Sequence, residues 1–237
     1  MISTYPTAGG AVGGGIAVVG TLNLSNTTVS GNRVNDSKGI SIGGGIAAIP
    51  QDSNMGGTFK LTNCTIYDNI SSGSKGGYGG GAEAEGVQGA IDFCTIYGNT
   101  ASTKGGGFAS GLVASAGKSN IELKNTLIAN NSAPNGPDIA GTITAGGYNL
   151  VQRFSGASWN DPANKHSTDL SGDKFANLGI DPHLHASDKA TPTLALLPSS
   201  PALNRIPSNS CDVSADQRGV KRPQQSACDI GAYEYAP

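Results

Sequence analysis

The sequence predicts an all-β fold, a parallel β-helix of about five turns with a loop-rich C-terminal cap. The main observation behind this prediction is a repeated unit that begins with a glycine triplet and ends with N-x-T-(I/V/L)-x-x-N. Its four copies occupy residues 13–32, 43–69, 79–99 and 105–131. The copies are unevenly spaced, although their strand-like pieces keep their size. Insertions confined to the joints are typical of a solenoid, in which each copy is one turn.

Composition agrees with this fold and excludes several classes of protein. Of 237 residues, 36 are glycine, and only 14% are charged, which favours many turns and small stacked side chains. The glycines follow no Gly-x-y period, so collagen is excluded. A net charge of −2 without a basic run argues against nucleic acid, and no apolar stretch is long enough to span a membrane. The N-terminus shows no signal-peptide pattern and enters the repeat at once, which suggests further turns upstream.

Each repeat offers three short strands whose residues alternate between two faces. In the first strand the charged pair Glu83 and Glu85 identifies the outward face. The inward residues of the three strands are then Ile16, Val18, Ile46, Ala48, Ala82, Ala84, Phe108 and Ser110; Leu22, Leu24, Phe59, Leu61, Ile121 and Leu123; and Thr27, Val29, Cys64, Ile66, Cys94, Ile96, Thr126 and Ile128. Successive turns are expected to stack about 4.8 Å apart.

Two columns of asparagine are expected at the corners. The residues before the third strand are Asn26, Asn63 and Asn125, and those after it are Asn32, Asn69, Asn99 and Asn131. Stacked amides bond to the turns above and below and to corner backbone groups. Phe93 interrupts the first column.

The four cysteines are consistent with export. Cys64 and Cys94 occupy equivalent inward positions on adjacent turns, so they are either buried thiols or a disulfide. We expect a bridge between Cys211 and Cys228, because it would close a loop of about 17 residues and add roughly 3 kcal/mol of stability.

The pattern loosens after Asn131. Strands at residues 141–144 and 148–151 indicate a fifth turn, so the helical part is placed at residues 1–151. Residues 152–237 are expected to form an irregular surface excursion around Trp159 and then a capping segment packed on the same solenoid. Such a cap covers the open core and the unpaired strand edges.

The C-terminal part contains DIAGTITAGGYNLV, GIDPHL, TPTLALLPSSPALN, DQRGVKRP and CDIGAYEY in that order. With the GGGI…LxLxNxTIxxN repeats, these motifs resemble the bacterial choice-of-anchor Q proteins over nearly the whole chain. The resemblance implies a right-handed parallel β-helix like that of pectate lyases, in a secreted or surface-displayed protein. Relatives often continue into an anchoring signal, whereas this chain ends at Pro237. The resemblance supplies no catalytic residues, so function has to be argued from the site.

Glu83 and Glu85 are the candidate catalytic residues. Carboxylates two residues apart on a strand share one face about 7 Å apart, which suits acid–base work on a glycoside or Ca²⁺ binding in a lyase. No other cofactor is expected. No Arg or Lys lies in the same column to act as a lyase base, and the alternative is a solvated pair that discourages aggregation.

Tyr67 and Tyr97, with Asp68 beside them, are the candidate ligand-binding residues. They sit at equivalent outward positions, where stacked rings either bind the apolar face of a sugar or only stabilise the sheet. A flat threonine array of the ice-binding type is a third alternative, with one complete rank made of Thr28, Thr65 and Thr95.

His183 and His185 share a strand face near Asp181 and Asp188, but without a further defined ligand no metal site is predicted.

The sequence as a whole favours a monomeric, secreted or cell-surface protein that binds extracellular polysaccharide or serves as a structural or adhesive module. The alternative is a polysaccharide lyase or glycoside hydrolase that uses the exposed carboxylates.

Overall fold

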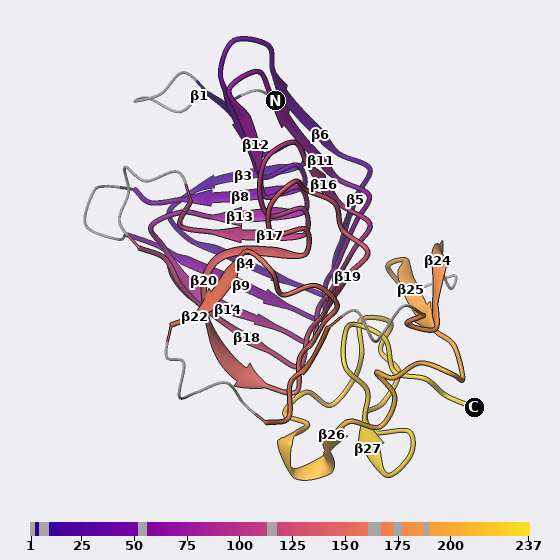
Figure 1. The fold of residues 1–237 in the computed structure, drawn as a ribbon. Helices are drawn as coiled ribbons and strands as arrows, with labels where there is room; N and C mark the ends of the chain where they lie inside the picture. Colours follow the sequence, from indigo (N-terminus) through magenta and orange to yellow (C-terminus); the bar gives the residue numbers. More distant parts are fainter. Residues whose placement is uncertain are drawn as a thin grey trace.

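The computed structural model describes residues 3–4, 10–51, 56–112, 118–160, 167–172, 177–186 and 190–237. These residues form short strands and a 3-10 turn, and none of them is α-helical. Most strands pair in parallel with their counterparts in neighbouring repeats, so that the sheets nearly close around a common core (Figure 1). The predicted all-β, parallel-stranded solenoid is confirmed.

Three parallel sheets form the wall of the solenoid. The first sheet contains β3 (Ile16–Val19), β8 (Ile46–Ile49), β13 (Ala82–Ala84), β17 (Phe108–Ser110), the beginning of β20 (Ile139–Gly147) and β22 (Ala157–Trp159). The second sheet contains β4 (Leu22–Ser25), β9 (Thr58–Thr62), β14 (Gln88–Asp92), β18 (Asn120–Lys124) and the end of β20. The third sheet contains β5 (Thr28–Ser30), β10 (Thr65–Tyr67), β15 (Thr95–Tyr97), β19 (Leu127–Ala129), β21 (Leu150–Val151) and β23 (Leu170–Ser171).

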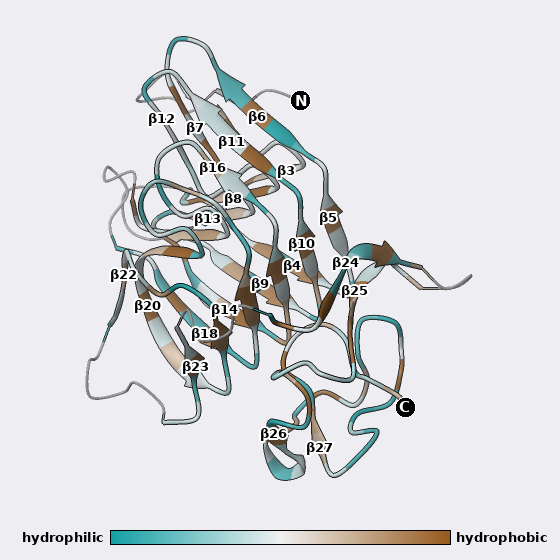
Figure 2. Ribbon diagram, turned by 45° about the vertical axis from the view of Figure 1, so that its right-hand side comes forward, coloured by the Kyte–Doolittle hydropathy of each residue, from teal (hydrophilic) through white to brown (hydrophobic). Residues whose placement is uncertain are grey.

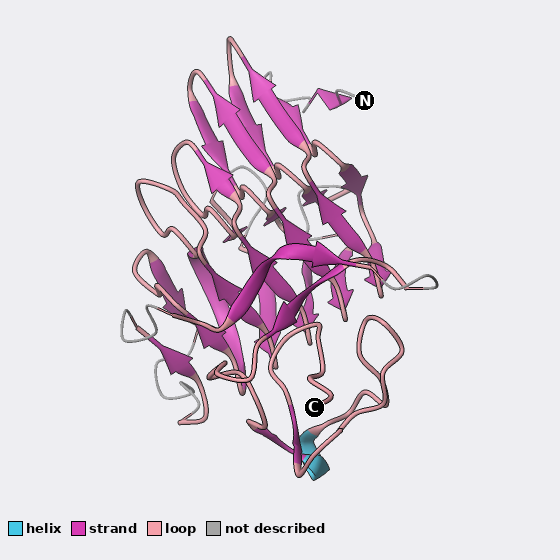
Figure 3. Cartoon of the chain, turned by 90° about the vertical axis from the view of Figure 1, so that its right-hand side faces the viewer, coloured by secondary structure: helices cyan, strands magenta, loops and turns pink. Residues whose placement is uncertain are grey.

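The loops between the third sheet and the next glycine triplet form strands that the repeat pattern did not predict. The outgoing strands are β6 (Arg33–Asp36), β11 (Ile70–Gly73) and β16 (Thr100–Ala101), and the returning strands are β7 (Ile40–Ile42) and β12 (Gly76–Tyr78). Strand β2 (Ala11–Val12) pairs with β7, and β1 (Ser3–Thr4) pairs with β2. We call residues 33–42, 70–78 and 100–104 the hood, which projects from the stack (Figure 3). Ile42 and Tyr78 of the hood pack with Ala47 and Ile49 on the outer side of the first sheet.

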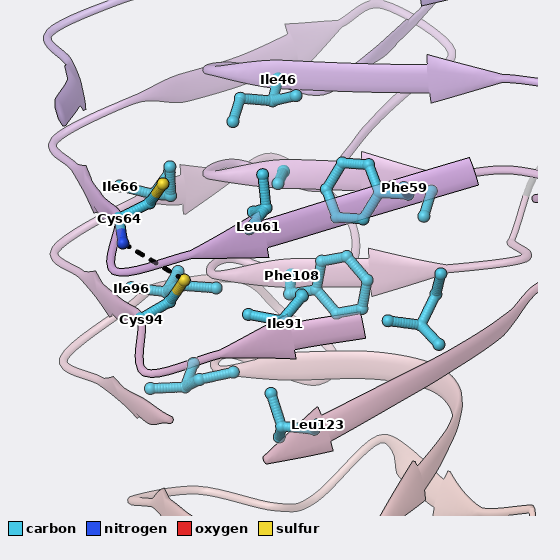
Figure 4. Close-up of a cluster of buried hydrophobic side chains, with 14 of the residues drawn as sticks. Ile46, Phe59, Leu61, Cys64, Ile66, Ile91, Cys94, Ile96, Phe108 and Leu123 are labelled. Atoms are coloured by element: carbon cyan, nitrogen blue, oxygen red, sulfur yellow. Dashed lines mark hydrogen bonds between the residues drawn. The ribbon is translucent and has the colours of Figure 1, made fainter. Parts of the chain in front are cut away.

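The predicted inward residues do face a common core. One apolar cluster contains residues of all three sheets, from Leu22 and Val29 at one end to Ile143 and Val151 at the other. Hydrophobic residues, coloured brown, recur at matching places on neighbouring strands of the stack (Figure 2). Cys64 and Cys94 are buried free thiols, one above the other, and the Cys64 N–H lies 3.4 Å from the Cys94 sulfur (Figure 4). The thiol alternative is therefore the observed one.

The second asparagine column is confirmed as a hydrogen-bonded ladder. The backbone N–H and the Nδ2 of each residue donate to the Oδ1 of its counterpart in the next turn, at 2.9–3.0 Å, in the order Asn32, Asn69, Asn99, Asn131. The ladder ends where Asn131 donates to Oδ1 of Asp138.

The prediction for the first asparagine column is wrong. Its members turn a left-handed corner, with φ of 49° at Asn26, 51° at Asn63, 48° at Phe93 and 50° at Asn125. Asparagine adopts this conformation more readily than most residues, which accounts for the pattern without stacking. A ladder runs instead through the following residues, from the Cys94 N–H to Thr126 Oγ1, from the Thr126 N–H to Asn149 Oδ1, and from the Asn149 N–H to Asp169 Oδ1.

The end of the stack is covered by the segment that was expected to be a surface excursion. Strand β22 pairs with β20, and Trp159 stacks on Phe154 with ring centroids 4.5 Å apart. Both rings are partly buried against the core. The excursion therefore covers the exposed core at this end, because its two aromatic side chains have apolar surface to bury there.

Residues 177–186 and 190–237, which we call the tail, lie instead against the flank of the stack. The tail contains β24 (Ile180–His185), β25 (Thr193–Leu196), β26 (Ile206–Pro207), the 3-10 turn at Ser208–Ser210 and β27 (Ala227–Cys228). The β24–β25 hairpin crosses in front of the third sheet (Figure 3). Apolar tail residues such as Leu196, Ile206 and Ile230 share a buried cluster with Phe93 and Leu127 of the solenoid. The predicted Cys211–Cys228 disulfide is present, with the Cα atoms 6.1 Å apart.

Candidate functional site

The candidate catalytic pair does not face solvent. Glu83 is 0% exposed and Glu85 is 2% exposed, so the expectation that these carboxylates are accessible is wrong. Glu83 is on the face opposite the core residues Ala82 and Ala84, as predicted, but it lies between Ala47 and Ala109 of the neighbouring strands, and that side of the sheet is covered. Glu85 follows the end of β13. A polysaccharide therefore has no access to these groups.

Burial is the main influence on the pKa of Glu83. Neither of its carboxyl oxygens has a hydrogen-bond partner among the described residues. Burial raises the pKa of Glu83 well above its ordinary value, and the nearby Glu85 carboxyl raises it further. Glu83 thus favours the neutral form of its carboxyl group.

Tyr67 and Tyr97 do stack, with ring centroids 6.4 Å apart. The Tyr67 hydroxyl donates to the Pro182 carbonyl at 2.8 Å, and the Tyr97 ring packs against the apolar cluster of the tail. Burial raises the pKa of Tyr97. Asp68 is exposed at a left-handed corner with φ of 51°. The stacked rings help to seat the tail, which favours the stabilising interpretation over a sugar platform.

The threonine rank of the third sheet is covered by the tail. Thr65 is fully buried and hydrogen-bonds to Thr193 and to Gln217 Oε1, both at 2.7 Å. Gln217 Nε2 donates to Thr28 Oγ1 at 2.7 Å, and the Ala232 N–H donates to Thr95 Oγ1 at 3.0 Å. A flat ice-binding array is therefore excluded on this face.

The DQRGVKRP and CDIGAYEY motifs form a buried polar network inside the tail. Arg222 pairs with Glu234 at 2.9 Å, both side chains being at most 1% exposed, and the Arg222 guanidinium lies 4.6 Å from the centre of the Phe93 ring. Asp216 accepts from Arg218 and from the Glu234 N–H. Every one of these groups is engaged within the protein, so the motifs hold the tail in shape and dock it on Phe93.

His183 and His185 both contact Asp181, at 2.9 Å for Nδ1 of His183 and 2.9 Å for Nε2 of His185. Asp188 lies outside the described residues. Within the described part of the chain, no three His, Cys, Asp or Glu side chains are grouped as metal ligands.

The outer face of the second sheet stays open, and sequence reasoning passed over it. No described segment lies over β4, β9, β14 and β18 (Figure 1). Its outward side chains form ranks one turn apart and are polar except for Ala90, which lies between Lys60 and Glu122. The exposed members are Asn23, Ser25, Thr58, Lys60, Gln88, Asn120 and Glu122. At one end Thr144 and Asn160 both donate to Asn120 Oδ1, at 3.0 and 3.2 Å. The alternation of these residues with Phe59, Leu61, Ile121 and Leu123 was the available signal.

A hollow of about 560 Å³ borders this face where the tail meets the corner residues. It is lined by Asn26, Asn63 and residues 212–219, among others. Lys124 ties the edge of the open face to the tail through Asp212 at 2.6 Å. Burial, with Asp212 adding to it, raises the pKa of Asp92 to about 6.

Fold and open face together define a parallel β-solenoid with one polar sheet surface. Comparison with known proteins gives no match, whether to a family model, a curated protein or a solved structure. Among the described residues there is also no helix with the length and apolarity that a membrane crossing requires.

Proposed function

We propose that this chain is a non-catalytic binding module for extracellular polysaccharide and that the outer face of the second sheet is its binding surface. The observation that carries the proposal is that this is the wall sheet whose outer face no described segment covers, whereas the hood covers the first sheet and the tail covers the third.

The chemistry of this face suits a hydroxyl-rich chain. Amides and hydroxyls such as Asn120, Gln88 and Thr58 offer both donors and acceptors to sugar hydroxyls. Lys60 and Glu122 carry opposite charges, so the face has no strong preference for a polyanion. Repetition from turn to turn allows several sugar units to be held at once, which multiplies weak contacts.

The Cys211–Cys228 bridge supports export to an oxidising compartment. We extend the proposal to a secreted or cell-surface monomer. Its coil is right-handed, as the resemblance implies and as parallel crossovers favour, and it has about five turns, as the repeat pattern predicts. A kinship with choice-of-anchor Q and pectate-lyase-like proteins belongs to the same proposal. The alternative of a lyase or hydrolase, with or without Ca²⁺, has lost the accessibility of Glu83 and Glu85 on which it depended.

The test is a panel of neutral and uronate polysaccharides, measured for binding by calorimetry and for product formation by reducing-end and absorbance assays. The double variant Lys60→Ala/Asn120→Ala is expected to weaken binding by roughly 30-fold, since each of the two hydrogen-bonding side chains contributes about 1 kcal/mol. The matched control is Lys38→Ala/Asn35→Ala, which removes the same two residue types from the exposed part of the hood.

Three results would contradict the proposal. If the parent protein binds no polysaccharide of the panel, the assignment is wrong. If Lys38→Ala/Asn35→Ala weakens binding as much as Lys60→Ala/Asn120→Ala does, the outer face of the second sheet is not the binding surface. If the parent protein releases products, the non-catalytic part is wrong.

A further inference from the structure

The Asp181–Pro182 peptide bond lies in an unusual setting within β24. Both oxygens of the Asp181 carboxylate are held by histidine: Oδ1 accepts from the N–H of His183 at 3.0 Å and from its Nδ1 at 2.9 Å, and Oδ2 accepts from Nε2 of His185 at 2.9 Å. The side chains of His183 and His185 are 83% and 52% exposed, so neither of them is placed there by core packing.

The backbone around this bond is also irregular. The pairing of β24 with β25 is regular at Leu184 and His185 but shifts register between Ile180 and Leu184. The Tyr67 hydroxyl holds the Pro182 carbonyl from the third sheet. The irregular stretch is thus anchored on its far side while the Asp181 carboxylate and both imidazoles stay accessible to water.

An Asp–Pro bond is chemically suited to self-cleavage. The carboxylate of Asp reaches its own carbonyl carbon through a five-membered ring, so the attack is intramolecular and benefits from proximity. The leaving group is the nitrogen of a tertiary amide, and it departs only when it receives a proton. A positioned imidazolium supplies such a proton, and general acid catalysis of this kind accelerates reactions by roughly 10²- to 10⁴-fold.

We propose that the chain cleaves its own peptide bond between Asp181 and Pro182. The Asp181 carboxylate oxygen forms a bond to the Asp181 carbonyl carbon, and the bond from that carbon to the Pro182 nitrogen breaks. The electron pair stays on nitrogen, which takes a proton from the imidazolium of His183 or His185. Water then opens the cyclic anhydride, leaving Asp181 as a new C-terminus and Pro182 as a new N-terminus.

The charges around the bond define the pH range of the reaction. Hydrogen bonds from the His183 backbone and from both imidazoles lower the pKa of Asp181 to about 2, so its carboxylate remains ionised in mild acid. General acid catalysis by a histidine requires the imidazolium form, and lowering the pH favours that form. Cleavage is therefore expected to be faster in mild acid than in mild base. On the facing elements, Tyr67 is the titratable contact of the third sheet, and β25 contributes no titratable residue.

Cleavage is expected to leave the two pieces associated. The C-terminal piece carries Thr193, Gln217 and Arg222, which contact Thr65, Thr28 and Phe93 of the solenoid. The product is a nicked protein of unchanged native size.

The experiment follows the purified full chain at about pH 5.5 and pH 8 by intact mass and denaturing gel, with native size measured in parallel. The expected result is a pair of fragments, residues 1–181 and 182–237, that accumulate faster at the lower pH. Hydroxylamine is expected to trap the anhydride as a hydroxamate at Asp181. The sequence supplies an internal control in Asp161–Pro162, where Ala163 and Lys165 occupy the positions that correspond to His183 and His185. We expect cleavage at residue 181 to exceed cleavage at residue 161 by roughly 10²-fold, the contribution of a general acid.

Two variants separate the roles of the side chains. Asp181→Asn removes the carboxylate nucleophile and is expected to abolish cleavage at this bond. His183→Gln/His185→Gln keeps hydrogen-bonding side chains without an acid, and cleavage is expected to fall to the rate at Asp161–Pro162. An intact parent chain at about pH 5.5, equal rates at the two Asp–Pro bonds, or an undiminished rate in the double variant would each overturn the proposal.

Discussion

The outer faces of the first and second sheets have the same strand geometry but differ in solvent exposure. Glu83 on the first sheet is fully buried, whereas Glu122 on the second is exposed, although both occupy outward positions of strands in the same stack. The difference comes from what the chain lays over each face, since the hood packs on the first sheet and no described segment lies on the second. An outward position in a solenoid is therefore not by itself a surface position.

The largest expected effect on the free energy of unfolding comes from breaking a buried ion pair, compared with an exposed one. Arg222→Ala leaves Glu234 buried without its partner, and breaking a buried pair costs about 3–5 kcal/mol. Lys124→Ala removes the partner of Asp212 at the edge of the open face, where exposed pairs contribute about 0–1 kcal/mol. Denaturant unfolding measures the loss of stability in both variants. Similar losses would contradict the burial of the Arg222–Glu234 pair within the tail.

A smaller effect is expected when the same residue type is removed from the two environments. Asn99→Ala deprives the Asn69 N–H of its acceptor in a buried ladder, at about 1–3 kcal/mol for each unsatisfied group. Asn120→Ala acts on the open face, where surface substitutions usually stay within about 0.5 kcal/mol. Thermal and denaturant unfolding of the two variants compare the positions directly, and equal losses would contradict the difference in burial.

The smallest expected effect is the pH dependence set by Glu83. Because its pKa is raised in the folded state, the folded protein holds this proton more tightly than the unfolded chain does. Stability is therefore expected to fall as pH rises above about 4.5, the ordinary glutamic acid value, and to keep falling until the folded-state pKa is passed. Glu83→Gln removes the contribution of this group, so the fall in stability is expected to become shallower, with the remainder set by other acids of raised pKa such as Asp92.

Unfolding of the parent and of Glu83→Gln at a series of pH values between about 5 and 8 provides the measurement. The matched control is Glu122→Gln, which removes an exposed carboxyl and is expected to leave the slope unchanged. Parallel pH dependences for the parent protein and Glu83→Gln would contradict the burial of an acid at residue 83.

The sequence predicts what depends on local periodicity. Residues such as Ile66 and Ile96 face the core because alternation within a short strand decides it, and the Asn32–Asn131 ladder follows from the repeat itself. The hood was not predicted because its strands lie in the insertions between the copies, outside the repeated pattern. Ile40, Ile42 and Tyr78, just before the glycine triplets, were the available signal.

The candidate site was mispredicted for a different reason. Whether Glu83 or Thr65 meets solvent depends on segments far away in the sequence, and Gln217 reaches Thr65 across 152 positions. No periodic pattern in one strand carries that information. The open face was recognisable only after the covers of the other two sheets had been located.

The two side-chain ladders also show how the regular stacking of turns stops. In both, each residue accepts from the turn before it and donates to the turn after it, and both end on an aspartate, at Asp138 and Asp169. A carboxylate side chain has no N–H group, so Asp138 closes the series of Nδ2 donors that begins at Asn32, where another asparagine would continue it. The second ladder is carried by backbone N–H donors, so Asp169 is simply its last acceptor among the described residues.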